Sequence, residues 1–387
     1  QTCALPIFVL RRAARLAQRI GARLVGVHIG DDSAVDTGSE ERRHAVESLA
    51  GEYHEVQHTY EGAFGDIPLG HYCLQSLVEQ LDVEELVKLT EAGFAFFEEK
   101  FGYPYPFGKY DQLYVPEYNM GAMENAGCVT LRDEYLPRSR QPRSFYEFRA
   151  SVILHEMAHM WFGDLVTMKW WNGIWLNEAF ATFMEHVGVD AYRPDWRPWD
   201  DFATGRAAAM EVDALTHTRT VEYEVHTPAD ADGMFDVLTY QKGGSVLRML
   251  ERWLGPERFR DGVRTYLDRH RLGNTETTDL WDAIEETTGE PVRRIMGSWI
   301  DQPGFPVVRR DGATLRQERF TYAPGAEPVT YAVPIVARVH HGGMTETRRV
   351  LLGAEPAPFA LPDDALVVLD DGGEGFYRVR SEEHTSE

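Results

Sequence analysis

The sequence predicts an α+β protein, with a mainly helical region in the middle, a small β-sandwich after it and a short β-α-β piece before it. Three observations lead to this prediction. Residues 61–302 carry apolar side chains at helical spacing, and residues 303–380 contain short alternating runs divided by Gly, Pro and Asp. Residues 1–60 open with an apolar run, a helical run and a second apolar run. We therefore expect domain boundaries near residues 60 and 302, and a polar tail at 381–387.

The first 60 residues have the pattern of a β-α-β unit. Apolar runs at Ile7–Leu10 and Arg23–Ile29 predict two strands, and the spacing over Arg11–Ile20 predicts a helix between them. The segment 11–28, together with Tyr53–Gln57, resembles the universal-stress-like domain of potassium-sensing histidine kinases. A stress-response nucleotide binder would need a glycine-rich phosphate loop, and none occurs before residue 61.

The central region begins with a helix that the sequence delimits at both ends. Asp82 is a candidate N-cap, Glu84 and Glu85 follow in the first turn, and Gly102 marks the end. The same criteria predict strands at Asp111–Val115 and Cys128–Leu131, and helices at Ser151–Phe162, Leu176–Val187, Lys242–Leu254 and Thr278–Thr287. In the sandwich, antiparallel strands are predicted around Val329–Val339, Arg348–Leu352 and Ala365–Leu369.

The chain is acidic and poor in cysteine, which excludes several classes of protein. It has 39 Lys and Arg against 62 Asp and Glu, a net charge of −23. Nucleic acids and anionic membranes bind clustered positive charge, so we expect neither as a partner. Three cysteines without metal-ligand spacing favour a reducing compartment. No apolar run reaches the ~20 residues of a membrane helix, and we expect a cytoplasmic protein.

One short motif points to a metal site. His155-Glu156-Met157-Ala158-His159 is an H-E-x-x-H pattern inside a predicted apolar helix. Its i, i+4 spacing puts both histidines on one face of the helix, where they can bind one metal ion, and Glu156 can reach a water molecule on that metal without binding the ion itself. The alternative is a pair of helix histidines beside a solvated glutamate.

A catalytic zinc site has three protein ligands and one open position, so a third ligand is required. Glu178 is the candidate, because it follows His159 by 19 positions and lies on the next predicted helix. Glu185, seven residues further on the same face, is predicted either to orient a metal-binding histidine or to be a surface carboxylate. Asn177 is predicted to serve in packing or local capping.

Two more motifs complete a family pattern. They are Gly121-Ala122-Met123-Glu124-Asn125, before the histidines, and Tyr240-Gln241-Lys242-Gly243, after Glu178. With these motifs in this order, the sequence resembles the zinc aminopeptidases related to aminopeptidase N, a gluzincin family, over about residues 62–380. The resemblance implies a thermolysin-like catalytic domain at 61–302 and a β-sandwich at 303–380.

The resemblance also implies a role for each motif residue. One Zn²⁺ ion per chain would be held by His155, His159 and Glu178, and would activate water and polarise the scissile carbonyl. Glu156 would act as general base and then as general acid. Tyr240 would donate a hydrogen bond to the developing oxyanion; its alternative is a buried aromatic residue at the start of a helix.

Glu124 would determine the class of substrate. In the family this carboxylate binds the free α-ammonium group of a peptide, which favours a charged N-terminus over mid-chain peptide. The substrate would lie along the neighbouring backbone, which Gly121, Ala122, Met123 and Asn125 contribute. The expected partners are therefore peptides with a free N-terminus. The alternative for Glu124 is a solvated loop carboxylate.

The sequence departs from the family pattern at both ends. Relatives begin with a large β-rich domain, and here the short universal-stress-like piece stands in its place. Residues 1–7 and 381–387 match neither family, and we expect a chimeric reading frame that contains a fragment of an aminopeptidase. Three alternatives stay open for the function: a fragment that binds zinc and peptide but is catalytically impaired, an epoxide hydrolase that shares most of the motifs, and the nucleotide binder named above.

Overall fold

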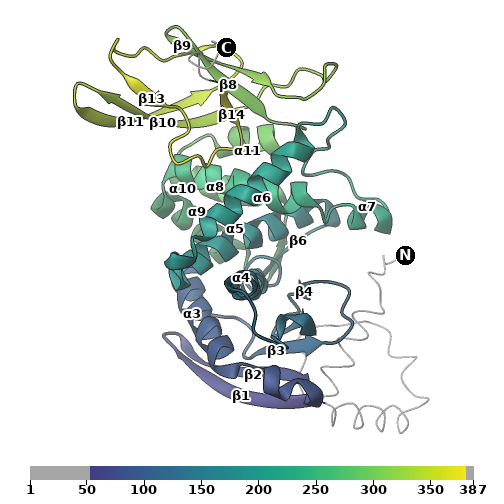
Figure 1. Cartoon of the computed structure of the whole chain (residues 1–387). Helices are drawn as coiled ribbons and strands as arrows, with labels where there is room; N and C mark the ends of the chain where they lie inside the picture. Colours follow the sequence, from purple (N-terminus) through teal and green to yellow (C-terminus); the bar gives the residue numbers. More distant parts are fainter. Residues whose placement is uncertain (1–52, 381–387) are drawn as a thin grey trace. The chain divides into compact units, whose positions relative to one another are not determined.

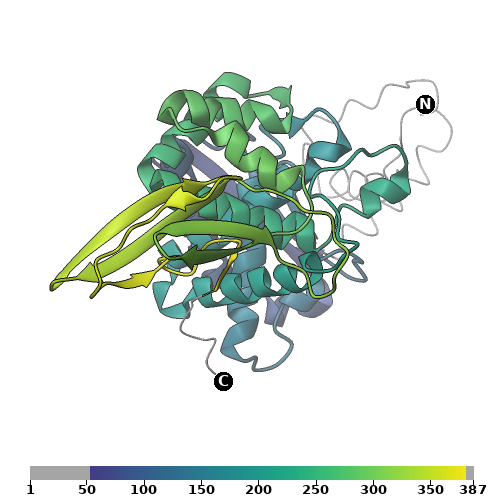
Figure 2. The same ribbon diagram turned by 90° about the horizontal axis from the view of Figure 1, so that it is seen from above.

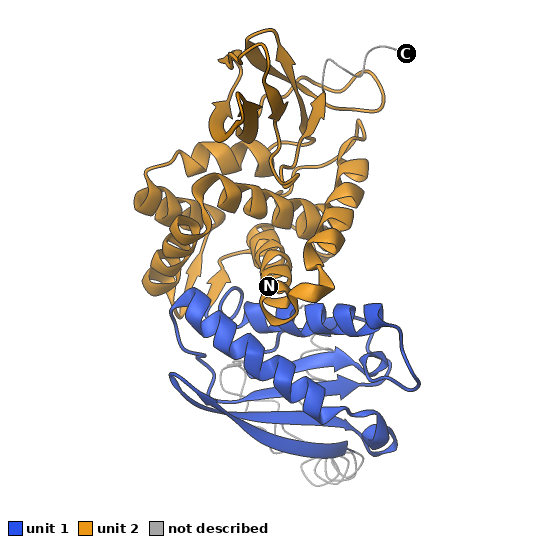
Figure 3. Ribbon diagram, turned by 60° about the vertical axis from the view of Figure 1, so that its left-hand side comes forward, with its two compact units in different colours: residues 1–165 blue, residues 166–387 orange. Residues whose placement is uncertain are grey.

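The structure is a computed structural model, and it describes residues 53–380 (Figure 1). The strands and helix predicted for residues 7–29, and the tail at 381–387, lie outside the described residues. The chain divides into two compact units, residues 1–165 and residues 166–387 (Figure 3). The mixture of helices and sheets confirms the predicted α and β composition.

The described part of the first unit, residues 53–165, contains one five-stranded sheet. The strands are β1 (Tyr53–Gly62), β2 (Gly65–Leu74), β3 (Tyr110–Val115), β4 (Ala122–Met123) and β5 (Cys128–Arg132), and their order is β1-β2-β3-β5-β4. The β1–β2 and β4–β5 pairs are antiparallel, whereas β3 runs parallel to both β2 and β5. The domain boundary predicted near residue 60 falls inside β1, because hydrogen bonding to β2 includes residues 53–60 in the sheet.

Among the described residues of this unit, the long helices are α3 (Val83–Phe101) and α4 (Arg143–His159), with short 3₁₀ turns at Gln75–Gln80 and Asp133–Tyr135. As predicted, α3 follows Asp82 and ends at Gly102, which adopts a left-handed conformation with φ of 65°. The Asp82 side chain, however, accepts no capping bond. Its two carboxylate oxygens accept from Arg149 of α4 at 2.7 and 2.8 Å. The predicted capping role is therefore wrong, because this charged partner takes the carboxylate.

Helices are the main regular structure in the described part of the second unit. They are α5 (Ile174–Tyr192), α6 (Pro198–Asp213), α7 (Pro228–Asp232), α8 (Gly243–Leu254), α9 (Pro256–His270), α10 (Thr277–Thr288) and α11 (Val292–Ile300). Two 3₁₀ turns (Trp171–Gly173 and Pro194–Trp196), a π-helical turn η6 (Leu238–Lys242) and the parallel strands β6 (Val166–Met168) and β7 (Gly273–Thr275) complete the helical part. Apolar side chains are buried on every side of α5, as expected of a helix at the centre of a core.

Seven strands follow α11 and form two small sheets (Figures 1 and 2). They are β8 (Pro306–Asp311), β9 (Thr314–Arg319), β10 (Val333–His341), β11 (Met344–Leu352), β12 (Ala357–Pro358), β13 (Leu366–Val368) and β14 (Arg378–Arg380). One sheet has the order β11-β10-β13 and the other β12-β9-β8-β14. The antiparallel prediction is wrong for one pair, since β14 runs parallel to β8.

Aromatic side chains join the last helix to these strands. Trp299 of α11 is fully buried, and its ring centroid lies 5.0 Å from that of Tyr331 and 6.4 Å from that of Phe376. The boundary predicted near residue 302 therefore lies within the second compact unit, and the division into domains stays a prediction. Within residues 53–380, no helix combines the length and the apolar character that crossing a membrane requires.

Candidate metal centre and its surroundings

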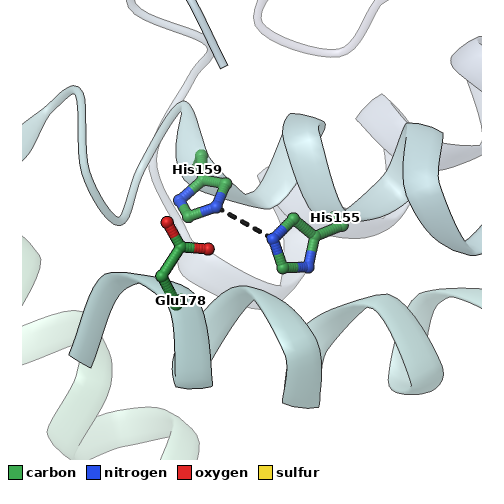
Figure 4. A group of neighbouring side chains, drawn as sticks. All are labelled: His155, His159 and Glu178. Carbon is green, nitrogen blue, oxygen red and sulfur yellow. Dashed lines mark hydrogen bonds between the residues drawn. The ribbon is translucent and has the colours of Figure 1, made fainter. Parts of the chain in front are cut away.

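The two histidines of the H-E-x-x-H motif lie one turn apart on α4. This helix buries Ile153, Leu154 and Met157, which fixes the face on which the histidines stand. The Nε2 atoms of His155 and His159 lie 3.1 Å apart (Figure 4). Two nitrogen ligands of a tetrahedral zinc ion, each ~2.0–2.1 Å from the metal, lie about 3.3 Å apart. The spacing of the two rings therefore suits one shared metal ion.

The protonation of His159 follows from its surroundings. Its Nδ1 lies 2.9 Å from the main-chain oxygen of Phe162. A carbonyl oxygen can only accept a hydrogen bond, so Nδ1 carries the proton and donates. The Nε2 lone pair of His159 is then free of a proton and directed at Nε2 of His155, which is the form that binds a metal ion.

Glu178 is the third member of the group. It lies on α5 and is buried, with 6% of its surface exposed. One ligand atom from each of His155, His159 and Glu178 lies within 4.8 Å of the others, and Figure 4 shows the three side chains pointing toward one another. Two imidazoles and one carboxylate are the donor set of many catalytic zinc sites. The residues present therefore fit a zinc ion.

Glu156 follows the first histidine on α4 and is also buried. Its negative charge contributes to raising the pKa of several tyrosines of the same unit. Burial raises the pKa of Tyr118, a hydrogen bond with Thr130 opposes that rise, and the charges of Glu156 and Glu124 add to it. Burial also raises the pKa of Tyr135, a rise that Arg132 opposes and Glu156 increases. Glu156 and Glu124 thus act on one tyrosine and lie in the same part of the molecule.

The Gly121–Asn125 motif forms the edge of the sheet. Its residues Ala122 and Met123 make up β4, which pairs with β5 and is the last strand in the order. This strand also contacts α4, the helix of the two histidines. The opposite side of β4 has no neighbouring strand among the described residues, so its main chain presents the hydrogen-bonding edge of a sheet.

Two side-chain contacts stabilise the loop that carries Glu124. The Asn125 side chain donates to Thr130 at 3.2 Å, and Thr130 contacts the hydroxyl of Tyr118 at 3.2 Å. The main-chain oxygen of Asn125 also accepts from the nitrogen of Cys128 at 2.8 Å. Asn125 therefore has a local role in holding the turn, and Glu124 itself is half-buried.

Tyr240 and Glu185 lie in the second unit. Tyr240 is half-buried in the π-helical turn η6, a feature that sequence periodicity did not predict. Glu185 lies on α5, where its carboxylate is 3.4 Å from Nδ1 of the neighbouring His186 and 15% of its side chain is exposed. Its side chain is thus mostly buried, and the orienting role toward a metal-binding histidine stays a prediction.

Asn177, which was predicted to serve in packing or local capping, has an unusual environment. The side-chain oxygen of Asn177 is buried and accepts no hydrogen bond from residues 53–380. Two residues that matter for the site were missed by sequence reasoning. Phe162 acts through its main chain, which leaves no signal in the sequence. Lys242 is part of the Tyr240–Gly243 motif, but the sequence did not show which residue its side chain would contact.

Comparison with known proteins finds one protein family and several relatives that this chain resembles. The model of the peptidase family M1 domain matches residues 86–299. The chain is 39% identical to an aminopeptidase N of Streptomyces lividans over 363 residues, which cover 87% of this chain and 42% of the relative. It is 38% identical to the tricorn protease-interacting factor F2 of Thermoplasma acidophilum, covering 82% of this chain and 40% of the relative.

A third relative is a leucyl aminopeptidase of Saccharolobus solfataricus. The identity is 37% over 300 residues, which cover 76% of this chain and 38% of the relative. The chain thus spans about two fifths of the length of these curated relatives. All four motifs, from Gly121 to Gly243, lie inside the range that the family model matches.

Proposed function

Because the chain belongs to peptidase family M1, we propose that it is the catalytic part of a zinc-dependent aminopeptidase, which removes the N-terminal residue of peptides. One observation carries this proposal: His155, His159 and Glu178 bring three ligand atoms within 4.8 Å of one another. The fold of the catalytic domain is proposed to be thermolysin-like, and the location cytoplasmic.

The metal would be held by Nε2 of His159, by a ring nitrogen of His155 and by a carboxylate oxygen of Glu178. A zinc ion at this place supplies a Lewis acid and lowers the pKa of water toward ~7. The main-chain oxygen of Phe162 keeps the Nδ1 proton of His159 in place, and so keeps Nε2 available for the metal.

Glu156 is proposed as the group that moves the proton. It is buried beside the metal ligands on the same helix, and it can accept a proton from the attacking water and return one to the leaving amine. Tyr240 is proposed to donate a hydrogen bond from its neutral phenol as negative charge develops on the carbonyl oxygen. Such donors act most strongly where water is excluded.

Glu124 is proposed as the anchor of the substrate. Its carboxylate follows the edge strand β4, so a peptide could add its main chain to that edge while its α-ammonium group pairs with Glu124. A mid-chain peptide nitrogen carries no charge and would leave the carboxylate unpaired. Gly121, Ala122 and Met123 would supply the edge, and Asn125 would hold the turn.

The proposal is tested with aminoacyl-anilide substrates and the zinc-loaded protein. We expect release of a free amino acid, loss of that release on addition of a chelator, and recovery with zinc. Glu156→Gln should lower kcat by roughly 10²–10⁴-fold while zinc content stays near one per chain. A matched control is Glu147→Gln, a half-buried carboxylate nine residues earlier on the same helix, which pairs with Arg143. Full zinc loading without turnover would contradict the proposed activity and favour a protein that only binds zinc and peptide.

A further inference from the structure

Side chains stabilise the turn that carries Tyr240 at both of its ends. At its start, one carboxylate oxygen of Asp236 accepts from the main-chain nitrogens of Leu238 and Thr239, at 2.9 and 3.1 Å. At its end stands Lys242, two residues after Tyr240, whose side chain is completely buried. The interaction at the end is unusual, because a fully buried lysine is rare and its charge requires a partner.

The partner is Asp213, the last residue of α6. Nζ of Lys242 lies 2.7 Å from a carboxylate oxygen of Asp213, and neither side chain is exposed. The other oxygen of Asp213 accepts from the hydroxyl of Thr218 at 2.8 Å and from the main-chain nitrogen of Gly304 at 2.9 Å. Nζ of Lys242 donates in turn to the main-chain oxygen of Gly304 at 3.1 Å. The ion pair thus holds one residue of the loop after α11 by both its N–H and its carbonyl.

The conformation of the loop at Gly304 allows these two hydrogen bonds. Gly304 has φ of 82°, a left-handed conformation that favours glycine. A Cβ atom there would lie 2.6 Å from Nε of Arg319 and 3.1 Å from the hydroxyl of Tyr331. A side chain at this position would strain the backbone and would have to displace Arg319. The loop leads directly into β8, so the ion pair connects the turn of Tyr240 to the strands of the C-terminal sheets.

The turn is also held close to the helix of Glu178. Gly243 follows Lys242 immediately, and a Cβ atom on it would lie 2.6 Å from the Cβ of Ala179, the residue after Glu178. Contacts between η6 and α5 extend this close approach. The position of Tyr240 relative to Glu178 therefore depends on how the turn is held against α5, and Lys242 is the side chain that holds its end.

We propose that Lys242 and Asp213 are positioning residues for Tyr240: their buried ion pair fixes the π-helical turn and so places the phenol for the reaction. This inference rests on the proposed function. A buried ion pair adds little net stability over an apolar pair of similar size. What the pair contributes here is a fixed position of the turn, since the bonds of Lys242 and Asp213 to Gly304 each join one atom to one atom of the loop.

The test is a double variant combined with the removal of the phenol. Lys242→Met with Asp213→Asn removes both charges, leaves no lone buried ion and keeps an acceptor for Thr218 and Gly304. We expect kcat to fall at least 10-fold with KM changed less than twofold and zinc content unchanged. In a Tyr240→Phe background the same pair of substitutions should lower kcat by less than twofold, because the group that they position is absent. An equal fall of kcat in both backgrounds would overturn the inference.

Arg248→Met is the matched control. Arg248 lies on the helix that follows the turn and forms partly buried ion pairs with Glu251 and Glu374, and its loss should leave kcat within twofold. Hydrogen exchange gives a second measurement that needs no activity. In the double variant, exchange of the amides of Leu238–Lys242 should quicken at least 10-fold, while that of α9 stays unchanged. Unchanged exchange in the turn would also overturn the inference, whereas a Tyr240→Phe variant with full kcat would count against the proposed function instead.

Discussion

Nε2 of His155 and Nε2 of His159 lie 3.1 Å apart, on one face of α4. Because Nδ1 of His159 donates to the oxygen of Phe162, a neutral His159 has its lone pair on Nε2, and at most one proton lies between the two Nε2 atoms. The pair is therefore arranged to receive a cation in place of the shared proton. The spacing and protonation of the two histidines are thus set by α4 and by the segment directly after it, whereas Glu178 comes from α5.

The first prediction concerns zinc affinity. Glu178→Gln should weaken zinc binding by more than 100-fold, because a charged ligand is lost. Glu185→Gln should weaken it by roughly 10–100-fold if Glu185 orients a ligating histidine. Competition with a chelator of known zinc affinity measures both. A Glu185→Gln protein with the affinity of the wild type would show that Glu185 does not orient a metal-binding histidine.

The second prediction concerns the choice of substrate. Glu124→Gln should raise KM for an aminoacyl-anilide at least 10-fold, because the α-ammonium group loses its charged partner. N-acetylated anilides, which lack that charge, should be very poor substrates of the unchanged protein. Steady-state kinetics with both substrates makes the comparison. If the unchanged protein hydrolysed both equally well, Glu124 would not be the anchor.

The third prediction concerns the ion pair between α3 and α4. Arg149 is 2% exposed and donates to both carboxylate oxygens of Asp82. Arg149→Met leaves that carboxylate without its partner and should lower the free energy of unfolding by about 3 kcal/mol. Thermal unfolding should show a melting temperature several degrees lower.

Arg143→Met is the control for this comparison. Arg143 lies on the same helix and pairs with Glu147, one turn away, where the arginine side chain is 57% exposed. An exposed i, i+4 pair stabilises a helix by only about 0.5 kcal/mol. Equal losses for the two variants would mean that burial of Arg149 has no effect on the strength of its pair.

The fourth prediction concerns pH. Burial raises the pKa of the Cys73 thiol to about 11 and that of the Cys128 thiol to about 12. Both folded-state values lie above the usual ~8.5. The stability due to the protonated thiols is therefore complete below pH ~8.5 and is lost as the pH rises through the folded-state values. Alkylation at pH 8, followed by peptide mapping, should leave Cys73 and Cys128 unmodified in the folded protein and modified in urea.

The sequence alone was sufficient for the features that depend on neighbours along the chain. Spacing of i and i+4 placed His155 and His159 on one face of a helix, and alternation placed β3 and β5 correctly. The limits of α8 and α10 were predicted to within one residue, but other helices began or ended several residues away from their predicted limits. For example, α4 begins at Arg143, eight residues before the prediction, because its first turns mix aromatic and charged residues without a clear apolar period.

Tertiary structure decided the features that join distant parts of the chain. Asp82 has the right position for a capping residue, but Arg149, 67 residues away, takes its carboxylate. The parallel pairing of β14 with β8 and the burial of Lys242 against Asp213 are likewise contacts between segments far apart in sequence. The sequence determined which residues can bind a metal and carry a proton, since those properties belong to single side chains and local spacing. Packing determined which partner each buried charge meets, because that choice depends on the segments that folding brings together.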